Sequence, residues 1–473
     1  MNTGLSDKME DHALESVPEA ARKGWLQISW NTAGLVTTLV MLFFGALVCF
    51  VAGVKIALMA GLSAFIIGNV IAWLIARVTY ATGFSNTLIT RKYGLGVRGS
   101  VLASLIFGFL IIGFLALENA LLYRGVIFFF DLDNNLFNQI FIYGLFTISW
   151  ILLTAFGFDL VSRVSSVMLV GFLVVLFWVI IDIVSGAERS VSELMLFESQ
   201  FPPDLLTRMG VHSDLDKFVF GLNILVGPAC ALALNTADFG RYGKSPTHIG
   251  IAASVGIGFQ SLIMMIVGGV LMFAGSDIML EHYTTVQGMS AQEAPRQVLK
   301  NPDSIAATFM VFAGATGFIL MFLAQAKAQV LNAYSSSLCL SNMSDALLGW
   351  RPGRLAFVVL ANVIALLMLY GHILELVEQW IKLLGVLLSA LSSVIIMDYF
   401  VVAKRVGESD QVEQINWAGV ISLVTAVVLA HWVLKPWQPI EVLSSIATVA
   451  VLYPVLRLWL LRPKGITRQT SSA

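Results

Sequence analysis

Two charged residues lie in the middle of long apolar segments, where no water is available to stabilise a charge. Lys327 lies within TFMVFAGATGFILMFLAQAKAQVLNAYSSSLCL, and Glu118 lies within SVLASLIFGFLIIGFLALENALLY. An ionisable side chain inside a membrane usually faces the bundle interior and marks a solute or ion pathway. The opposite signs suggest one shared cavity, in which Lys327 would hold or release a proton. The alternative is that the span ends near Lys327 and its ammonium reaches the interface.

The neighbours of these charges are suited to binding a flat polar solute. Phe114 precedes Glu118 by four residues, so both side chains fall on one face of a helix. A ring and a carboxylate facing one cavity would stack on such a solute and hydrogen-bond it, and Asn119, Gln329 and Asn332 are further candidate polar contacts. The alternative is that Phe114 is ordinary core and that Glu118 is neutral or paired inside the bundle.

A glycine–proline pair interrupts the apolar segment KFVFGLNILVGPACALALNTADFGRYGKSP. Pro228 removes a backbone donor and its ring clashes with the preceding turn, so Gly227-Pro228 predicts a broken helix whose exposed backbone dipoles face a solute. The alternative is a simple kink. Asn235 lies beyond the break, where it binds solute or caps a helix. Gly45 and Gly53 give a weaker signal for a matching break in the first apolar segment.

The composition indicates an all-helical integral membrane protein. Of 473 residues, 58% are hydrophobic and 12% are charged, far from the composition of soluble proteins. Windows of about 20 apolar residues predict about twelve spans. These lie near 33–54, 58–80, 99–123, 138–157, 165–184, 218–236, 251–274, 306–338, 355–371, 381–402, 415–434 and 442–461. The sequence thus predicts one transmembrane domain over 33–462, between cytoplasmic tails at 1–32 and 463–473.

The distribution of basic residues predicts the orientation. Alternate loops are basic, which places both termini in the cytoplasm of a multi-pass protein of the plasma membrane, or of the inner membrane in a bacterium. The net charge of −1 gives no reason to expect nucleic acid, so the expected partners are the lipid bilayer and a small molecule. The basic residues that carry this inference are Arg22, Lys23, Arg91, Lys92, Arg98, Arg163, Arg241, Lys244, Arg351, Arg354, Lys404, Arg405, Arg462, Lys464 and Arg468.

Enzymatic chemistry is not expected. The six histidines are scattered, and no HExxH, GxSxG or P-loop spacing occurs. The three cysteines fall in apolar segments, without a zinc spacing or a disulfide framework. We therefore predict no catalytic residues, no metal site and no cofactor.

The chain resembles the nucleobase:cation symporter-1 family, which contains cytosine, purine, uracil, allantoin and hydantoin permeases. The resemblance covers most of residues 25–462. Its most specific pieces are ATGFSNTLITRKYGLGVRGSVLASLIFG before and into the third span, NTADFGRYGKSP after the sixth, and MDYF at 397–400. LNAYSSSLCLSN together with Pro228 is most similar to the purine–cytosine permease branch.

The resemblance implies two inverted five-helix repeats plus two additional helices, with the solute between broken helices 1 and 6 and spans three and eight. Family members clamp a planar ring with aromatic residues in spans three and six, positions that hold Phe114 and Ala229 here. Glu118 stands at the position of a neutral amide. Sodium-coupled relatives carry hydroxyl residues where Lys327 and Ala328 align, so an ammonium in the place of the cation implies coupling to protons.

These inferences predict a secondary active transporter that imports a nucleobase such as a purine or cytosine, or a related planar heterocycle, by cation symport with protons. Glu118 would be the main polar contact and Lys327 the cation-coupling residue. The alternative is a sodium-coupled symporter of the same fold for allantoin- or hydantoin-like, amino-acid, osmolyte or cationic solutes. A non-transporting membrane receptor or channel is a third interpretation.

Overall fold

The computed structural model describes residues 12–155, 158–186, 190–286, 288–290, 293–294, 302–370, 377–407 and 412–462. Within these ranges the regular structure is helical, and an isolated backbone bridge joins Lys23 to Gly243. The predicted C-terminal tail at 463–473 and residues 1–11 of the predicted N-terminal tail lie outside the described residues.

Each predicted span has a helical counterpart. In chain order the spans are α2 (Trp25–Val36) with α3 (Leu39–Ala52), α4 (Val54–Thr82), α6 (Ser100–Phe129), α7 (Leu136–Ala155), α8 (Phe158–Gly186), α11 (Asp214–Gly240), α12 (Pro246–Gly258) continued by η2 (Phe259–Met264) and α13 (Met265–Ala274), α16 (Pro302–Leu348), α17 (Arg354–Tyr370), α18 (Val377–Met397), α20 (Trp417–Val428) continued by η6 (Leu429–Val433), and α21 (Glu441–Val455) continued by η7 (Leu456–Leu460). The connecting segments hold η1 (Glu19–Ala21), α5 (Asn86–Lys92), α9 (Val191–Leu196), α10 (Pro203–Arg208), α14 (Ser276–Glu281), η3 (His282–Val286), η5 (Asp398–Val402) and α19 (Ala403–Val406).

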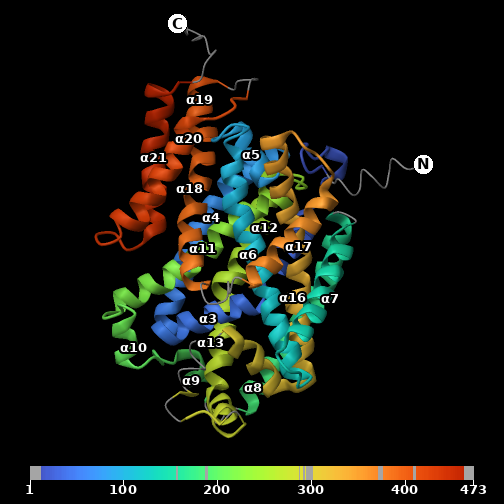
Figure 1. The fold of residues 1–473 in the computed structure, drawn as a ribbon. Coiled ribbons are helices and arrows are strands. Elements are labelled where there is room, and N and C mark those ends of the chain that lie inside the picture. The colour runs from blue at the N-terminus through green and yellow to red at the C-terminus, as the bar shows by residue number, and fades with distance from the viewer. Residues whose placement is uncertain are drawn as a thin grey trace, which may run out of the picture.

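The lengths and composition of these helices confirm the predicted membrane architecture. Within the described residues, nine helices are long and apolar enough to cross a bilayer, and the bent pair α2–α3 makes a tenth span. Two shorter apolar helices, Arg354–Tyr370 and Trp417–Val433, stand at the predicted ninth and eleventh spans. Figure 1 shows α5 and α19 at one end of the bundle, called the α5 end below, and α9 at the other. At one flank α20 packs beside α21, and at the opposite flank α7 packs beside α17.

The two spans that carry the buried charges lie side by side. Helix α6, with Glu118, packs along α16, with Lys327, over most of its length. Nearly the whole of α6 is buried, because the helix lies at the centre of the bundle and few of its residues face lipid. Spans three and eight, which the resemblance placed beside the solute, therefore form a packed pair.

The first span is broken, but at a different place from the glycines that signalled it. Helices α2 and α3 are bent by 64° at Thr37 and Thr38. Thr38 has extended backbone angles and caps α3, since its hydroxyl accepts from the Met41 N–H. Gly45 instead lies against the backbone of Met265 in α13, where a side chain would have no room. The span also begins earlier than predicted, at Trp25, so the boundary placed at residue 33 falls inside α2.

The chain before α2 packs on the α5 end of the bundle. Val17 is buried, and its N–H donates to the carbonyl of Gly83, just after α4. The Ser16 hydroxyl donates to the Thr82 carbonyl at 2.8 Å. The Arg241 guanidinium donates to the His12 carbonyl at 2.6 Å. The described part of the N-terminal segment is thus attached to the ends of spans two and six.

The sixth span corrects a prediction, because the break expected at Gly227-Pro228 is absent from α11. One helix runs from Asp214 to Gly240 with Pro228 inside it. The physical reason is packing: a Cβ on Gly227 would come within 3.0 Å of the Ile381 carbonyl and 3.3 Å of Gly385 in α18. The glycine therefore brings α11 against α18, and such close neighbours hold a proline-containing membrane helix together.

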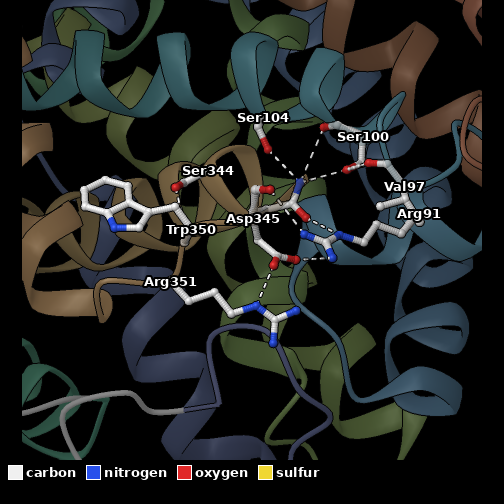
Figure 2. A network of polar contacts seen from close by, with 9 residues as sticks. Arg91, Val97, Ser100, Ser104, Ser344, Asp345, Trp350 and Arg351 are labelled. Carbon is white, nitrogen blue, oxygen red and sulfur yellow. Dashed lines mark hydrogen bonds and ion pairs between the residues drawn. The ribbon is translucent and has the colours of Figure 1, made fainter. Parts of the chain in front are cut away.

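Hydrogen bonds between polar side chains join α6 and α16 at the α5 end of the bundle, as Figure 2 shows. Arg91 of α5 donates to Asp345 Oδ2 and to Asn342 Oδ1, each at 2.6 Å. The Asn342 amide donates in turn to the hydroxyls of Ser100 at 3.0 Å and Ser104 at 2.8 Å. The network joins α5 and α6 to the end of α16, and most of its members are buried.

This network yields a stability prediction. Arg91→Ala leaves the buried acceptors of Asn342 and Asp345 without their shared donor, so it is expected to destabilise the protein by about 1–3 kcal/mol. Arg351→Ala is the matched control, because Arg351 also donates to Asp345 but its side chain is 66% exposed, and such pairs contribute about 0–1 kcal/mol. Thermal unfolding in detergent measures both. Equal losses in the two variants would contradict the assignment.

Candidate functional site

A pocket lies at the centre of the bundle, beside the break in the first span. In this conformation its cavity volume is about 30 Å³, which is room for a few water molecules. Its walls come from α2, α3, α6, α11, η2 and α16, so it is enclosed by spans one, three, six, seven and eight. The lining residues are Leu35, Val36, Met41, Leu110, Ile111, Phe114, Glu118, Pro228, Ala231, Leu232, Asn235, Gln260 and Asn332.

Phe114 and Glu118 both face this pocket, as their four-residue spacing predicted. The Phe114 ring meets the Trp380 ring of α18 edge to face, with centroids 5.2 Å apart. That contact fixes the orientation of Phe114 from behind and leaves its other side toward the pocket. Glu118 is 2% exposed, and its Oε2 atom has no hydrogen-bond partner. The site therefore offers an aromatic surface beside an unsatisfied acceptor.

Glu118 also contacts the break in the first span. The hydroxyl of Thr38, the N-cap residue of α3, hydrogen-bonds the Glu118 carboxyl group. Thr38 thereby accepts from its own helix and donates to α6 at the same time. A side chain from span three thus fixes one side of the break.

Lys327 fixes the other side. Its Nζ atom donates to the carbonyl of Thr37, the C-cap residue of α2, and to the carbonyl of Ala324 at 2.9 Å. It also lies 4.3 Å from the centroid of the Phe172 ring in α8, in a cation–π contact. The last carbonyls of a helix lack partners within it and carry partial negative charge, so a cation is stabilised there. Lys327 is fully buried, which excludes the interfacial position that the sequence left open.

Glu118 and Lys327 interact through space without touching. Both residues are described, and no ion pair within 4 Å joins them, although each lies in the field of the other. They meet consecutive residues of the same break, Thr38 and Thr37. The prediction that the two opposite charges share one cavity is not borne out, because Glu118 lines the pocket and Lys327 does not; the backbone of span one links them instead.

The far side of the pocket is formed by α11. Asn235 Oδ1 accepts from the Ser335 hydroxyl of α16 at 2.9 Å, whereas its Nδ2 donor has no partner. Pro228 lines the pocket about two turns before Asn235, and Asn332 of α16 lines it as well. One turn after Asn235, the buried Asp238 accepts from the N–H of Asn86 at 2.9 Å and from its amide at 3.2 Å. This bond joins the two most specific motifs of the sequence.

Four of the predicted contact residues lie outside the pocket lining. The Gln329 amide donates to the Leu115 carbonyl at 2.9 Å and to Asn119 Oδ1 at 2.6 Å, and Asn119 also accepts from the Trp150 indole at 3.0 Å. These bonds hold α6 to α16 and α7. Gly227 packs on α18, and Ala229 lies against Gly68 of α4, so the second aromatic position of the resemblance is filled by helix packing.

Sequence reasoning missed two polar residues of the site. Gln260 lines the pocket from span seven, and Thr38 binds Glu118 at the break. Gln260 carries the same signal that singled out Lys327, a polar side chain in the middle of the apolar stretch AASVGIGFQSLIMMIVGG. Thr38 gives no comparable signal, because threonine is common in membrane helices and its hydroxyl usually bonds its own backbone.

Solved structures share this fold. The chain is similar to Mhp1, a nucleobase-cation-symport-1 family transporter, in a closed conformation with bromovinylhydantoin bound: 15% identity, TM-score 0.71, with 98% of each chain covered. For the inward-facing conformation of Mhp1 the identity is 15% and the TM-score 0.68, over 93% of this chain and 91% of that one. A substrate-bound, outward-open Na⁺-coupled sialic acid symporter matches with 14% identity and a TM-score of 0.58, over 96% of this chain and 94% of that one.

A search of curated proteins finds no match for the sequence. A family model does match, over residues 17–454, and its description is a permease for cytosine/purines, uracil, thiamine and allantoin. The match reaches into every span and includes both charges at the break, and the resemblance drawn from the motifs is confirmed. The chain is thus a multi-pass membrane permease, not an enzyme, and it belongs to the cytosine/purine, uracil, thiamine and allantoin permease family.

Proposed function

We propose that the protein imports a nucleobase such as a purine or cytosine, or a related planar heterocycle, by proton symport across the plasma membrane or a bacterial inner membrane. The observation that supports this most strongly is the pocket in which Phe114 lies beside the unpartnered Oε2 of Glu118. A heterocyclic base offers a flat face to the ring and N–H donors to the carboxylate. The bound ligand in one Mhp1 structure, bromovinylhydantoin, is also a heterocycle with polar edges.

Each pocket residue has a defined part in this proposal. Phe114 stacks on the solute, Glu118 accepts hydrogen bonds from it, and Asn235 donates one through its free Nδ2. Pro228 and Asn332 complete the walls. Asn119 and Gln329 act indirectly: their hydrogen bond holds α6 against α16 and so fixes the position of Glu118 along the bundle.

The surroundings of Lys327 support coupling to protons. Its ammonium donates to the carbonyl oxygens of Thr37 and Ala324. Backbone carbonyls are the kind of ligand that a bound sodium ion requires in broken-helix transporters. A second cation at that point would be repelled by the positive charge of the lysine. We infer that Lys327 is the fixed or titrating cation of the cycle, and that the α5 end faces the cytoplasm together with both termini. The pocket opens to either side when the bundle rocks around it.

The first test is the driving ion. Uptake of labelled adenine, cytosine and allantoin is measured in proteoliposomes with and without sodium, and with a protonophore. Accumulation of at least one of them is expected without sodium, and the protonophore is expected to abolish it because the proton gradient is the energy source. Accumulation that requires sodium and survives the protonophore would refute proton coupling and favour the sodium-coupled alternative.

The second test concerns Glu118. Glu118→Gln replaces the charged acceptor with a neutral amide, and solute affinity is expected to fall about 10- to 100-fold because charge-assisted hydrogen bonds are the stronger ones. The ligand-induced rise in thermal stability reports the affinity by mass action. Glu441→Gln is the matched control, since Glu441 is also buried but pairs with His431 and Lys435 away from the pocket. An unchanged ligand-induced rise in thermal stability in Glu118→Gln would show that Glu118 does not contact the solute.

The third test concerns Lys327. Lys327→Met removes the donor to Thr37 and Ala324, and protonophore-sensitive accumulation is expected to be lost while the folded protein persists, because the break loses its cation. Lys382→Met is the control, since Lys382 also lies over a phenylalanine ring, that of Phe220 at 5.3 Å, but not at the pocket. Full proton-driven accumulation by Lys327→Met would contradict the assigned role.

A further inference from the structure

Gln260 is a buried polar residue of the pocket whose amide donor is unpaired. Its side chain is 3% exposed, it lines the pocket, and its Nε2 donor has no partner. Buried donors are nearly always paired in native proteins, because an unpaired one costs the full desolvation penalty. A donor left open at the wall of a pocket is therefore expected to be satisfied by the molecule that the pocket binds.

The backbone around Gln260 is built to aim this side chain. Gln260 lies in η2, a π-helical turn between α12 and α13, and single π-turns are frequent at functional sites. The extra residue of such a turn widens the helix and changes the direction of its side chains. Two glycines make room for the wider turn: Gly61 of α4 lies against the Ser261 carbonyl, and a Cβ on Gly45 of α3 would come within 2.8 Å of the Met264 carbonyl. Neighbouring backbones thus hold η2 from two sides.

The pocket presents three unpartnered polar atoms from three different elements. Oε2 of Glu118 in α6 is an acceptor, whereas Nδ2 of Asn235 in α11 and Nε2 of Gln260 in η2 are donors. A solute that satisfies all three needs at least one N–H donor and two acceptors around a ring that stacks on Phe114. Ring nitrogens and exocyclic carbonyls of heterocyclic bases are acceptors of this kind.

We propose that Gln260 determines solute specificity, because its amide donates a hydrogen bond to a ring nitrogen or carbonyl oxygen of the planar heterocycle. The inference rests on the proposed function and adds span seven to the contacts of the site. A site with a buried donor discriminates against analogues that lack the matching acceptor, since binding them leaves the donor unpaired. Gln260 thereby selects among flat molecules of equal size.

The experiment compares solutes that differ by one acceptor. The purified full-length protein is titrated with adenine, cytosine and hypoxanthine, and with analogues in which one ring nitrogen is replaced by C–H, including 1-deaza-, 3-deaza- and 7-deazaadenine. Ligand-induced thermal shifts report the affinities. The wild-type protein is expected to bind a parent base about 10- to 100-fold more tightly than one of its analogues. In Gln260→Leu that difference disappears, because no donor remains to be left unpaired.

Two further variants keep the test specific. Gln260→Glu replaces the donor with an acceptor and is expected to weaken the parent base more than the analogue. Ser261→Ala is the matched control, since Ser261 lies in the same π-turn and its buried hydroxyl has no partner, but it does not line the pocket; its ranking of solutes stays that of the wild type. Unliganded melting temperatures show that each variant folds.

The outcomes separate the two proposals. If the wild-type protein ranks the solutes and Gln260→Leu keeps the same ranking, Gln260 is not a specificity contact and the proposed function stands. If the wild-type protein binds none of the parent bases, the proposed function fails and the role of Gln260 fails with it. Loss of ranking in Ser261→Ala as well would assign the effect to the shape of η2 and overturn a direct contact by Gln260.

Discussion

The arrangement of the bundle depends on how the break in the first span is held. The break at Thr37 and Thr38 lies buried inside the bundle, in a region where water is scarce. Lys327 binds the Thr37 carbonyl from span eight, and Glu118 binds the Thr38 hydroxyl from span three. Each charge offsets part of the burial cost of the other while satisfying the break. Because the pocket lies beside this point, the contacts that hold the break also border the candidate site.

Physical patterns in the sequence were sufficient for the coarse architecture. Apolar windows located the spans, since a bilayer imposes a minimum helix length, and Phe114 and Glu118 face one pocket because four residues make about one helical turn. The boundary at residue 33 was late because α2 begins with Trp25, ahead of the most apolar stretch. Orientation and coupling ion remain predictions.

The details that sequence did not reveal depend on which helices become neighbours. Gly227-Pro228 reads as a break in isolation, but Gly227 packs on Gly385 and α11 continues. Asn119 and Gln329 were predicted to bind the solute, yet their side-chain amides hydrogen-bond each other between α6 and α16. Gly45 reads as a second break and proves to be the point where α13 approaches α3. In each case a polar or small residue has two possible partners, and the tertiary contact decides between them.

The covalent attachment of the cation at the break has a consequence of its own. The occupancy of a metal-ion site depends on the external concentration of the ion, whereas the ammonium of Lys327 is tethered to α16 and its effective concentration at Thr37 is constant. On the proposed function, the bent geometry of the first span would therefore not require a bound alkali metal ion.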